Sequence, residues 1–160
     1  QGMAKADAQE HARQYLKQVG LESFSSHKPS QLSGGMRQRI ALARTIATKP
    51  RLLLLDEPFS ALDMQTRRMM QRYLLSVWND SAATILMITH DLHEALMLAD
   101  RIALMASSPR GHIAEIMDIE LSRPRNPEDP AIRAIQQQLN RFLEHETLLA
   151  EHDPTLESAK

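Results

Sequence analysis

The chain has 160 residues, enough for one ordinary domain or slightly more. Its apolar content of 42% can form a core, and 19 basic residues nearly balance 20 acidic ones, so no strong field favours nucleic acid or anionic lipid. The sequence contains no cysteine, which excludes a disulfide framework and a thiolate metal site and fits a cytoplasmic protein. No stretch approaches the roughly 20 apolar residues of a membrane span, and no secretory leader is expected.

Helical and strand patterns alternate from the first residues onward. An apolar stripe predicts an amphipathic helix over residues 5–19, followed by a polar connector at 22–31. A second helix is expected to open at Ser33 and to end before Pro50. Four leucines at 52–55 lie between turn signals, which predicts a strand buried on both faces, as in a parallel sheet.

The alternation continues through the middle of the chain. Helical spacing returns at 64–78, with Met70, Leu74 and Val77 on its core side, and a short apolar strand is predicted at 84–89.

The next helix has a start signal of its own. Asp91 and Glu94 form a possible capping box for a helix that runs through Leu98. A third strand is expected at 101–106 and an edge strand at 112–121.

The last part of the chain begins with a predicted turn at 107–111, between those two strands. After the proline-rich segment 122–130, a final amphipathic helix is expected from 131 to 145, and the tail beyond residue 151 is expected to be loose. Helices and strands alternate without an internal repeat, which predicts an α/β layered domain.

Asp56 and Glu57 follow the leucine strand, at the end of the strand that ligand sites in open α/β sheets favour. Neighbouring strand residues point to opposite faces, so one carboxylate could hold Mg²⁺ while the other orients or deprotonates a water. His90 follows the 84–89 strand at the same edge and could donate to a phosphate. Taken without further context, the Asp56–Glu57 pair and His90 are each better explained as ordinary polar turn residues.

A glycine pair opens the second helix, although glycine costs about 1 kcal/mol against alanine inside a helix. Gly34 and Gly35 would let a phosphate approach backbone N–H groups that lack helical partners, and Ser33 adds a hydroxyl. The alternative is that Ser33 is an ordinary N-cap before a flexible turn. Asp63, taken alone, is best explained as the N-cap of the helix that follows it.

Four short motifs in a fixed order give these residues a common context: LSGGM at 32–36, LLLLDEP at 52–58, SALD at 60–63 and TH at 89–90. Over residues 5–118 this set closely resembles the ATP-binding cassette (ABC) family. Met36 departs from the family's usual glutamine.

The resemblance implies a role for each motif residue. Ser33, Gly34 and Gly35 would form the signature motif that contacts ATP, and Asp63 would belong to the D-loop. Asp56 would end the Walker B strand and bind Mg²⁺, Glu57 would be the catalytic carboxylate, and His90 would be the switch histidine.

Longer stretches, GGMRQRIALART, DEPFSALDMQTR and THDLHEALMLADRIALM, resemble the ATPase subunits of nitrate, sulfonate, taurine and bicarbonate importers. This resemblance implies an ATP-hydrolysing subunit that energises uptake of a small anionic solute. Its implied partners are a second ATPase subunit in a homodimer, transmembrane permease subunits and, indirectly, a solute-binding protein, but not nucleic acid. Its implied location is cytoplasmic, peripheral on the inner face of the cell membrane.

The pattern G-x-x-x-x-G-K-[ST], which cradles phosphates in P-loop proteins, does not occur in the sequence. In the family this loop lies upstream of the signature motif, and the signature faces the nucleotide of the other cassette. We therefore expect a C-terminal portion of a P-loop NTPase cassette, inactive alone. Residues 1–121 are expected to be a partial ATPase domain, and residues 122–160 a proline-rich linker, a C-terminal helix and a loose tail.

Two other functions remain open at this stage. One is the ATPase head of a DNA-repair or chromosome-organising protein, although neither a sustained heptad pattern nor a basic excess is present. The other is a non-catalytic ABC-like assembly module, which the missing P-loop favours and the intact Glu57 and His90 oppose. The coding sequence upstream of Gln1 would discriminate between an ATPase and an assembly module.

Overall fold

A computed structural model describes residues 4–81, 83–106 and 111–151, with the side chains of 147–151 left out. The chain divides into two compact units, Gln1–His90 and Asp91–Lys160. The predicted tail beyond residue 151 and, apart from Gly111, the predicted turn at 107–111 lie outside the described residues. The division into functional domains at 1–121 and 122–160 stays a prediction, since compactness alone does not assign function.

The first unit follows the predicted order of elements. Its elements are α1 (Lys5–Gln18), η1 (Glu22–Phe24), η2 (Pro29–Gln31), α2 (Gly34–Ala47), β1 (Leu52–Asp56), α3 (Met64–Asp80) and β2 (Thr84–Ile88). Gly20 follows α1 with a φ of +69°, the left-handed conformation that glycine adopts without strain at helix ends. The polar connector contains two short 3₁₀ turns that the sequence did not predict.

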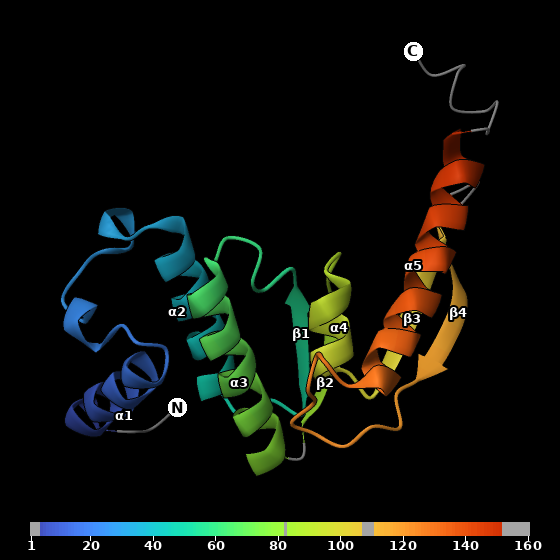
Figure 1. Ribbon diagram of the computed structural model, residues 1–160. Coiled ribbons are helices and arrows are strands. Elements are labelled where there is room, and N and C mark those ends of the chain that lie inside the picture. The colour runs from blue at the N-terminus through green and yellow to red at the C-terminus, as the bar shows by residue number, and fades with distance from the viewer. Residues whose placement is uncertain (1–3, 82, 107–110, 152–160) are drawn as a thin grey trace. The chain divides into compact units, whose positions relative to one another are not determined.

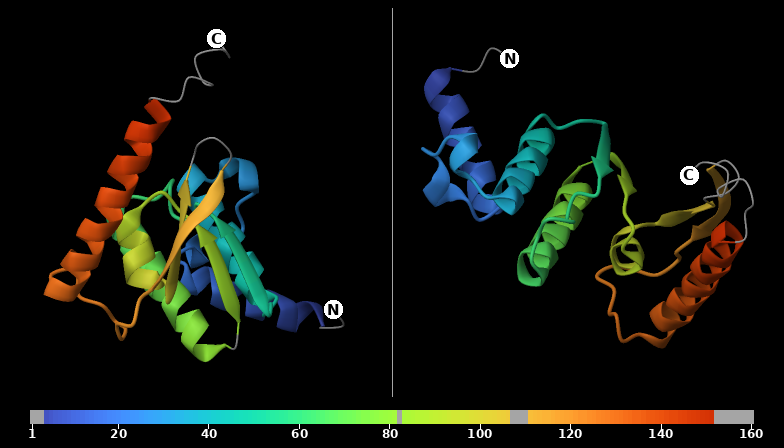
Figure 2. Two further views of the ribbon diagram at one scale, coloured as in Figure 1. Left: turned by 90° about the vertical axis from the view of Figure 1, so that its right-hand side faces the viewer. Right: turned by 90° about the horizontal axis from the view of Figure 1, so that it is seen from above.

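The strands β1 and β2 form a parallel pair, as expected. Their register places Leu52 opposite Thr84 and Asp56 opposite Ile88, so the two strands end at the same edge. Helices α2 and α3 lie on one side of this pair (Figures 1 and 2). That arrangement brings the chain segments that follow both strands to one place.

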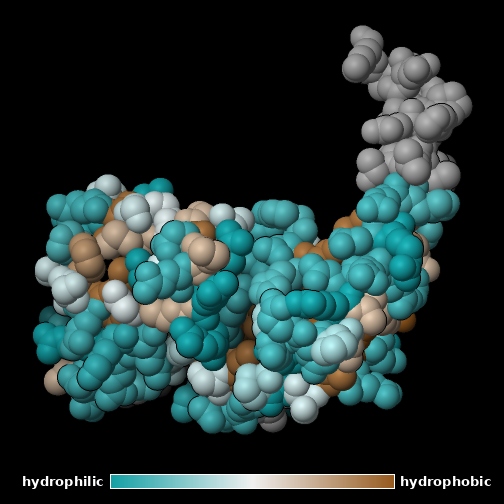
Figure 3. All heavy atoms as spheres, viewed as in Figure 1, coloured by the Kyte–Doolittle hydropathy of each residue, from teal (hydrophilic) through white to brown (hydrophobic). Residues whose placement is uncertain are grey.

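The prediction that the leucine strand is buried on both faces is wrong for the described structure. Leu53 is buried, but Leu54 is 63% exposed, and Leu86 and Ile88 beside it on β2 are 59% and 61% exposed. The reason is that the helices of this unit cover only one face of the pair. Figure 3 shows one face of the molecule, which is mostly hydrophilic with apolar side chains gathered in several places. The exposed side chains of Leu54, Leu86 and Ile88 form an apolar strand face.

The second unit contains α4 (Leu92–Leu98), β3 (Arg101–Ala106), β4 (His112–Asp118) and α5 (Pro130–Glu151). Strands β3 and β4 pair in antiparallel fashion, in agreement with an edge strand. Strand β4 ends three residues before the predicted limit of 121, and α5 runs past the predicted end at 145. Asp91 caps α4 by accepting hydrogen bonds from two backbone N–H groups, those of His93 and Glu94.

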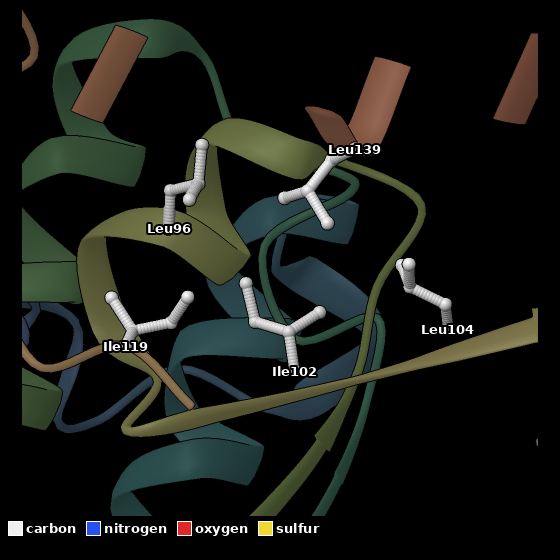
Figure 4. Close-up of a cluster of buried hydrophobic side chains, with 5 residues drawn as sticks. All are labelled: Leu96, Ile102, Leu104, Ile119 and Leu139. Carbon is white, nitrogen blue, oxygen red and sulfur yellow. The ribbon is translucent and has the colours of Figure 1, made fainter. Parts of the chain in front are cut away.

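The hydrophobic core of the second unit is formed by side chains from its helices and from its strand pair. Five buried side chains from α4, β3, α5 and the end of the β4 segment meet there: Leu96, Ile102, Leu104, Ile119 and Leu139 (Figure 4). The Arg125 guanidinium donates to the carbonyls of Leu96 and Ala99 and so ties the proline-rich segment to the end of α4. Among the described residues, no helix is long and apolar enough to cross a membrane.

Candidate functional site

The ends of β1 and β2 bring two predicted catalytic residues together. The Glu57 N–H donates to the carbonyl of Ile88 at 2.9 Å, which extends the strand pairing by one residue. His90 lies two residues after the end of β2, and its Nδ1 lies 3.0 Å from Oε1 of Glu57. The two residues are 33 positions apart in the chain, so the parallel pairing brings them together. We refer to Glu57 and His90 as the strand-end pair.

Glu57 has a strained backbone. Its φ is +42°, in the left-handed region that residues with a side chain rarely adopt. Its carbonyl accepts hydrogen bonds from Nε2 of Gln38 at 2.8 Å and from Oγ of Ser60 at 3.1 Å. Such strain costs on the order of 1–3 kcal/mol and persists where surrounding contacts hold it.

The strand-end pair is open to solvent. The Glu57 side chain is 46% exposed and that of His90 is 75% exposed. Ion pairs at such exposed sites contribute about 0–1 kcal/mol to stability, so this contact adds little to the stability of the fold. With Glu57 ionised, Nδ1 of His90 carries the proton and donates to the carboxylate; Nε2 donates elsewhere only when the ring is doubly protonated.

A second group of predicted residues surrounds the start of α2. A hollow of about 380 Å³, which we call the α2 hollow, is lined by Ser33, Gly34, Gly35, Met36, Arg39, Ala61, Leu62, Asp63 and Thr66. Four of the predicted site residues, Ser33, Gly34, Gly35 and Asp63, are thus in one place. Asp56, Glu57 and His90 do not line it.

Ser33 is the N-cap of α2, and its hydroxyl oxygen accepts a hydrogen bond from the Met36 N–H at 3.2 Å. The simpler interpretation is confirmed for Ser33 as an N-cap, but Gly34 and Gly35 belong to the helix and not to a flexible turn. A serine hydroxyl that accepts one hydrogen bond can also donate one, and a second role of Ser33 as donor to a ligand stays a prediction.

The two glycines of α2 meet different surroundings. A Cβ at Gly35 would lie 3.0 Å from the carbonyl oxygen of Ala61 and 3.2 Å from Leu62. A Cβ at Gly34 would meet nothing within 4 Å. Gly35 therefore packs so closely that an added Cβ would require the Ala61 backbone to shift, whereas Gly34 leaves an open approach to the first turn of the helix.

Asp63 is the N-cap of α3, as predicted when this residue is considered without the other motifs. Its carboxylate accepts from the Thr66 hydroxyl at 2.6 Å and from the Thr66 N–H at 3.0 Å. These bonds lower the pKa of Asp63 below its ordinary value. On the same hollow, Arg39 supplies a positive charge and donates to the Val19 carbonyl at 3.0 Å.

The residues fit a phosphate and one edge of a magnesium site. The first turn of a helix offers N–H groups without helical partners, and Gly34 leaves them accessible. Asp56 is an exposed carboxylate at the end of β1. Among the described residues, no three His, Cys, Asp or Glu side chains could hold a metal together, so Asp56 fits Mg²⁺ as a single ligand beside phosphate and water.

Sequence reasoning missed Gln38. Its Nε2 donates to the Glu57 carbonyl at 2.8 Å, and its Oε1 accepts from the Ala61 N–H at 3.2 Å. Its partners lie 19 and 23 residues further along the chain, so no local pattern could have identified it.

Comparisons with known proteins give the family context of these residues. A family model described as "ABC transporter" matches residues 3–60, which include the α2 glycines and the two carboxylates at the end of β1. The chain is 49% identical over 122 residues to the bicarbonate transport ATP-binding protein CmpD of Synechocystis. It is 47% identical over 114 residues to the nitrate import ATP-binding protein NrtD of Synechococcus elongatus.

These alignments cover 76% and 71% of this chain but 43% and 42% of the relatives, so the chain spans less than half the length of those relatives. A solved structure of the cassette MJ0796, a dimer in a post-hydrolysis state bound to ADP and Pi, is similar with a TM-score of 0.64 and 29% identity. That match covers 79% of this chain and 51% of the other. The predicted α/β fold of a P-loop NTPase cassette is confirmed by this likeness.

Proposed function

We infer that the chain belongs to the ABC transporter family, and from this premise we propose that the full-length protein is the ATP-hydrolysing subunit of an importer for a small anionic solute. The observation that carries the proposal is the 3.0 Å contact between Glu57 and His90. It places a carboxylate and an imidazole at the carboxyl ends of two parallel strands, where α/β folds bind ligands.

In the proposed reaction Glu57 is the general base. Its ionised carboxylate accepts a proton from the attacking water, while the Nδ1–H of His90 donates to Oε1 and holds the carboxylate in one orientation. When the imidazole carries its second proton, Nε2 donates to a phosphate oxygen and stabilises the charge that develops there. The exposure of both side chains implies that a partner surface closes over them during the reaction.

The other predicted residues have supporting roles. Asp56 would hold Mg²⁺, which when bound neutralises charge on the phosphates. Ser33 and Gly34 would donate to the γ-phosphate of a nucleotide held by a second ATPase subunit, with Asp63 at the rim of the same hollow. These assignments rest on the open approach at Gly34 and on the family motifs.

The names of the relatives support the solute class. Bicarbonate and nitrate, which the names of two relatives print, are both small monoanions. The sulfonate group of compounds such as taurine also carries one negative charge. We therefore include in the proposal transmembrane permease subunits and a solute-binding protein as partners, with the ATPase on the inner face of the membrane. Nucleic acid is not among the proposed partners, because the net charge of −1 provides no basic surface excess.

The test uses the full-length protein with Mg-ATP. Release of phosphate at a rate above background supports the ATPase, and its absence supports a non-catalytic assembly module.

A second measurement tests the contact with the partner subunit. In a Glu57→Gln background, size-exclusion chromatography with ATP should show a dimer, and Ser33→Arg should abolish it by placing a bulky cation in the α2 hollow. Ser25→Arg, at an exposed serine outside the hollow, is the matched control and should leave the dimer intact. A dimer that survives Ser33→Arg would leave Ser33 as a helix cap only.

A further inference from the structure

We propose that Gln38 is a positioning residue that couples the α2 hollow to the strand-end pair, an inference that rests on the proposed function. Its side-chain amide bridges two backbone groups of the turn that carries Glu57. The sequence motifs do not assign it a role. Its amide bonds to the backbone of Ala61, which lines the hollow, and to the backbone carbonyl of Glu57 rather than to the reacting carboxylate.

The first step is the geometry of the bridge. Nε2 of Gln38 donates to the Glu57 carbonyl at 2.8 Å, and Oε1 accepts from the Ala61 N–H at 3.2 Å. One amide group therefore spans both ends of the turn from Glu57 to Ala61. A second, longer contact of 3.5 Å joins Nε2 to Oγ of Ser60 within the same turn.

The second step is the strain at Glu57. Its φ of +42° needs contacts that hold it. Ser60 also donates to this carbonyl, but from three residues away, so it moves together with the turn. Gln38 holds the carbonyl from another element, 19 residues distant in sequence. It is thus the bond that fixes the Glu57 turn relative to α2.

The third step is the contact of α2 with Ala61 at two points. The Ala61 N–H bonds to Gln38, and a Cβ at Gly35 would lie 3.0 Å from the Ala61 carbonyl oxygen. Gly35 and Gln38, one helical turn apart on α2, therefore both lie against Ala61, at the end of the turn that begins with Glu57. Because a helix moves as a rigid element, a ligand that shifts the first turn of α2 also shifts the backbone of Glu57.

The test separates the two halves of the bridge. Gln38→Glu keeps an acceptor for the Ala61 N–H but loses the donor to the Glu57 carbonyl; Gln38→Lys keeps a donor and loses the acceptor. Gln9→Glu, the same change at an exposed position of α1, is the control for added charge. Far-UV circular dichroism checks that each variant folds, and Gln38→Met replaces any variant that does not.

In the full-length protein we expect Gln38→Glu to lower kcat for ATP hydrolysis about tenfold, with KM for Mg-ATP unchanged, because a misplaced base slows chemistry and not binding. Gln38→Lys should lower kcat by a smaller factor, and Gln9→Glu should leave kcat unchanged. A wild-type kcat in folded Gln38→Glu, or a rise in KM with kcat intact, overturns the proposal.

A measurement without nucleotide distinguishes this proposal from the proposed function. The ¹⁵N chemical shift of His90 Nδ1 reports on its bond to Glu57 and should move in Gln38→Glu in the same direction as in Glu57→Gln. If the full-length protein does not hydrolyse ATP, the proposed function fails and this shift alone decides the role of Gln38. A His90 signal identical to wild type in folded Gln38→Glu overturns the positioning role whatever the rate.

Discussion

The α2 hollow and the strand-end pair belong to the same compact unit, yet their side chains are held in opposite ways. In the hollow, Ser33 and Asp63 each bond to a group three residues ahead, so both are occupied as helix caps. In the strand-end pair, Glu57 and His90 meet from 33 residues apart and stay exposed. The bonds in the hollow thus stabilise the starts of two helices, whereas the exposed pair contributes little to folding stability. Substitutions in the hollow should mainly lower the free energy of unfolding, and substitutions in the pair should mainly lower the rate of ATP hydrolysis.

The largest effect should come from the pair. In the full-length protein, Glu57→Gln should reduce ATP hydrolysis by about 10²–10⁴-fold, because the amide keeps the shape of the carboxylate but cannot accept the proton of water. ATP binding and thermal stability should stay near wild type, since the exposed contact contributes little to folding. Steady-state phosphate release, nucleotide titration and melting measure the three quantities. Glu22→Gln, at an exposed position on η1, is the control, and wild-type turnover in Glu57→Gln would remove Glu57 from the mechanism.

The two glycines of the hollow offer the next comparison. Gly35→Ala should be less stable than Gly34→Ala by about 1–3 kcal/mol, the usual cost of overpacking, because only its Cβ meets the Ala61 carbonyl oxygen at 3.0 Å. Both variants gain the same kind of helix propensity, so their difference isolates the clash. Urea denaturation of each variant gives the free energies. Equal values would mean that the turn at Ala61 yields freely and that Gly35 is not a packing requirement.

A smaller effect is expected for the cap of α2. Ser33→Ala should lower the free energy of unfolding by about 1 kcal/mol, since the Met36 N–H loses its acceptor. Ser33→Asp keeps an acceptor and should keep the stability, but its negative charge should weaken ATP-dependent dimer formation in the full-length protein. Chemical denaturation and size exclusion measure the two properties separately. Dimer formation unchanged in Ser33→Asp would confine Ser33 to its role as a cap.

The smallest effect should appear only in acid. The pKa of Asp63 is lowered in the folded state, first by the Thr66 hydroxyl and then by the Thr66 N–H. Because the folded pKa lies below the unfolded one, the contribution of Asp63 is present above its ordinary value of 3.8 and is lost as pH falls through the lower folded value. Asp63→Asn keeps an acceptor without the charge and should remove this part of the acid sensitivity. Melting curves at a series of pH values test it, and parallel pH profiles for wild type and Asp63→Asn would contradict it.

Much of the fold could be predicted because its signals are local. The starts of α2, α3 and α4 follow from Ser33, Asp63 and Asp91, each of which bonds within three residues of itself. The parallel pairing of β1 and β2 follows from two short apolar runs separated by a helix. The exposure of Leu54 was not predictable, because burial of a strand face depends on which other elements cover it.

For the candidate site, the residues themselves and their common edge followed from the sequence alone. The types and order of Ser33, Glu57 and His90 pointed to phosphate chemistry. The alternation of strand, helix and strand predicted a parallel pair whose two strands end at the same edge. Only the tertiary structure decided that Gly35 packs closely against Ala61 while Gly34 is open, and that Gln38 bonds to the turn that carries Glu57. The physical reason is distance along the chain: caps and turns are satisfied by neighbours within one helical turn, whereas the partners of Gly35 and Gln38 are brought within reach only when separate elements pack.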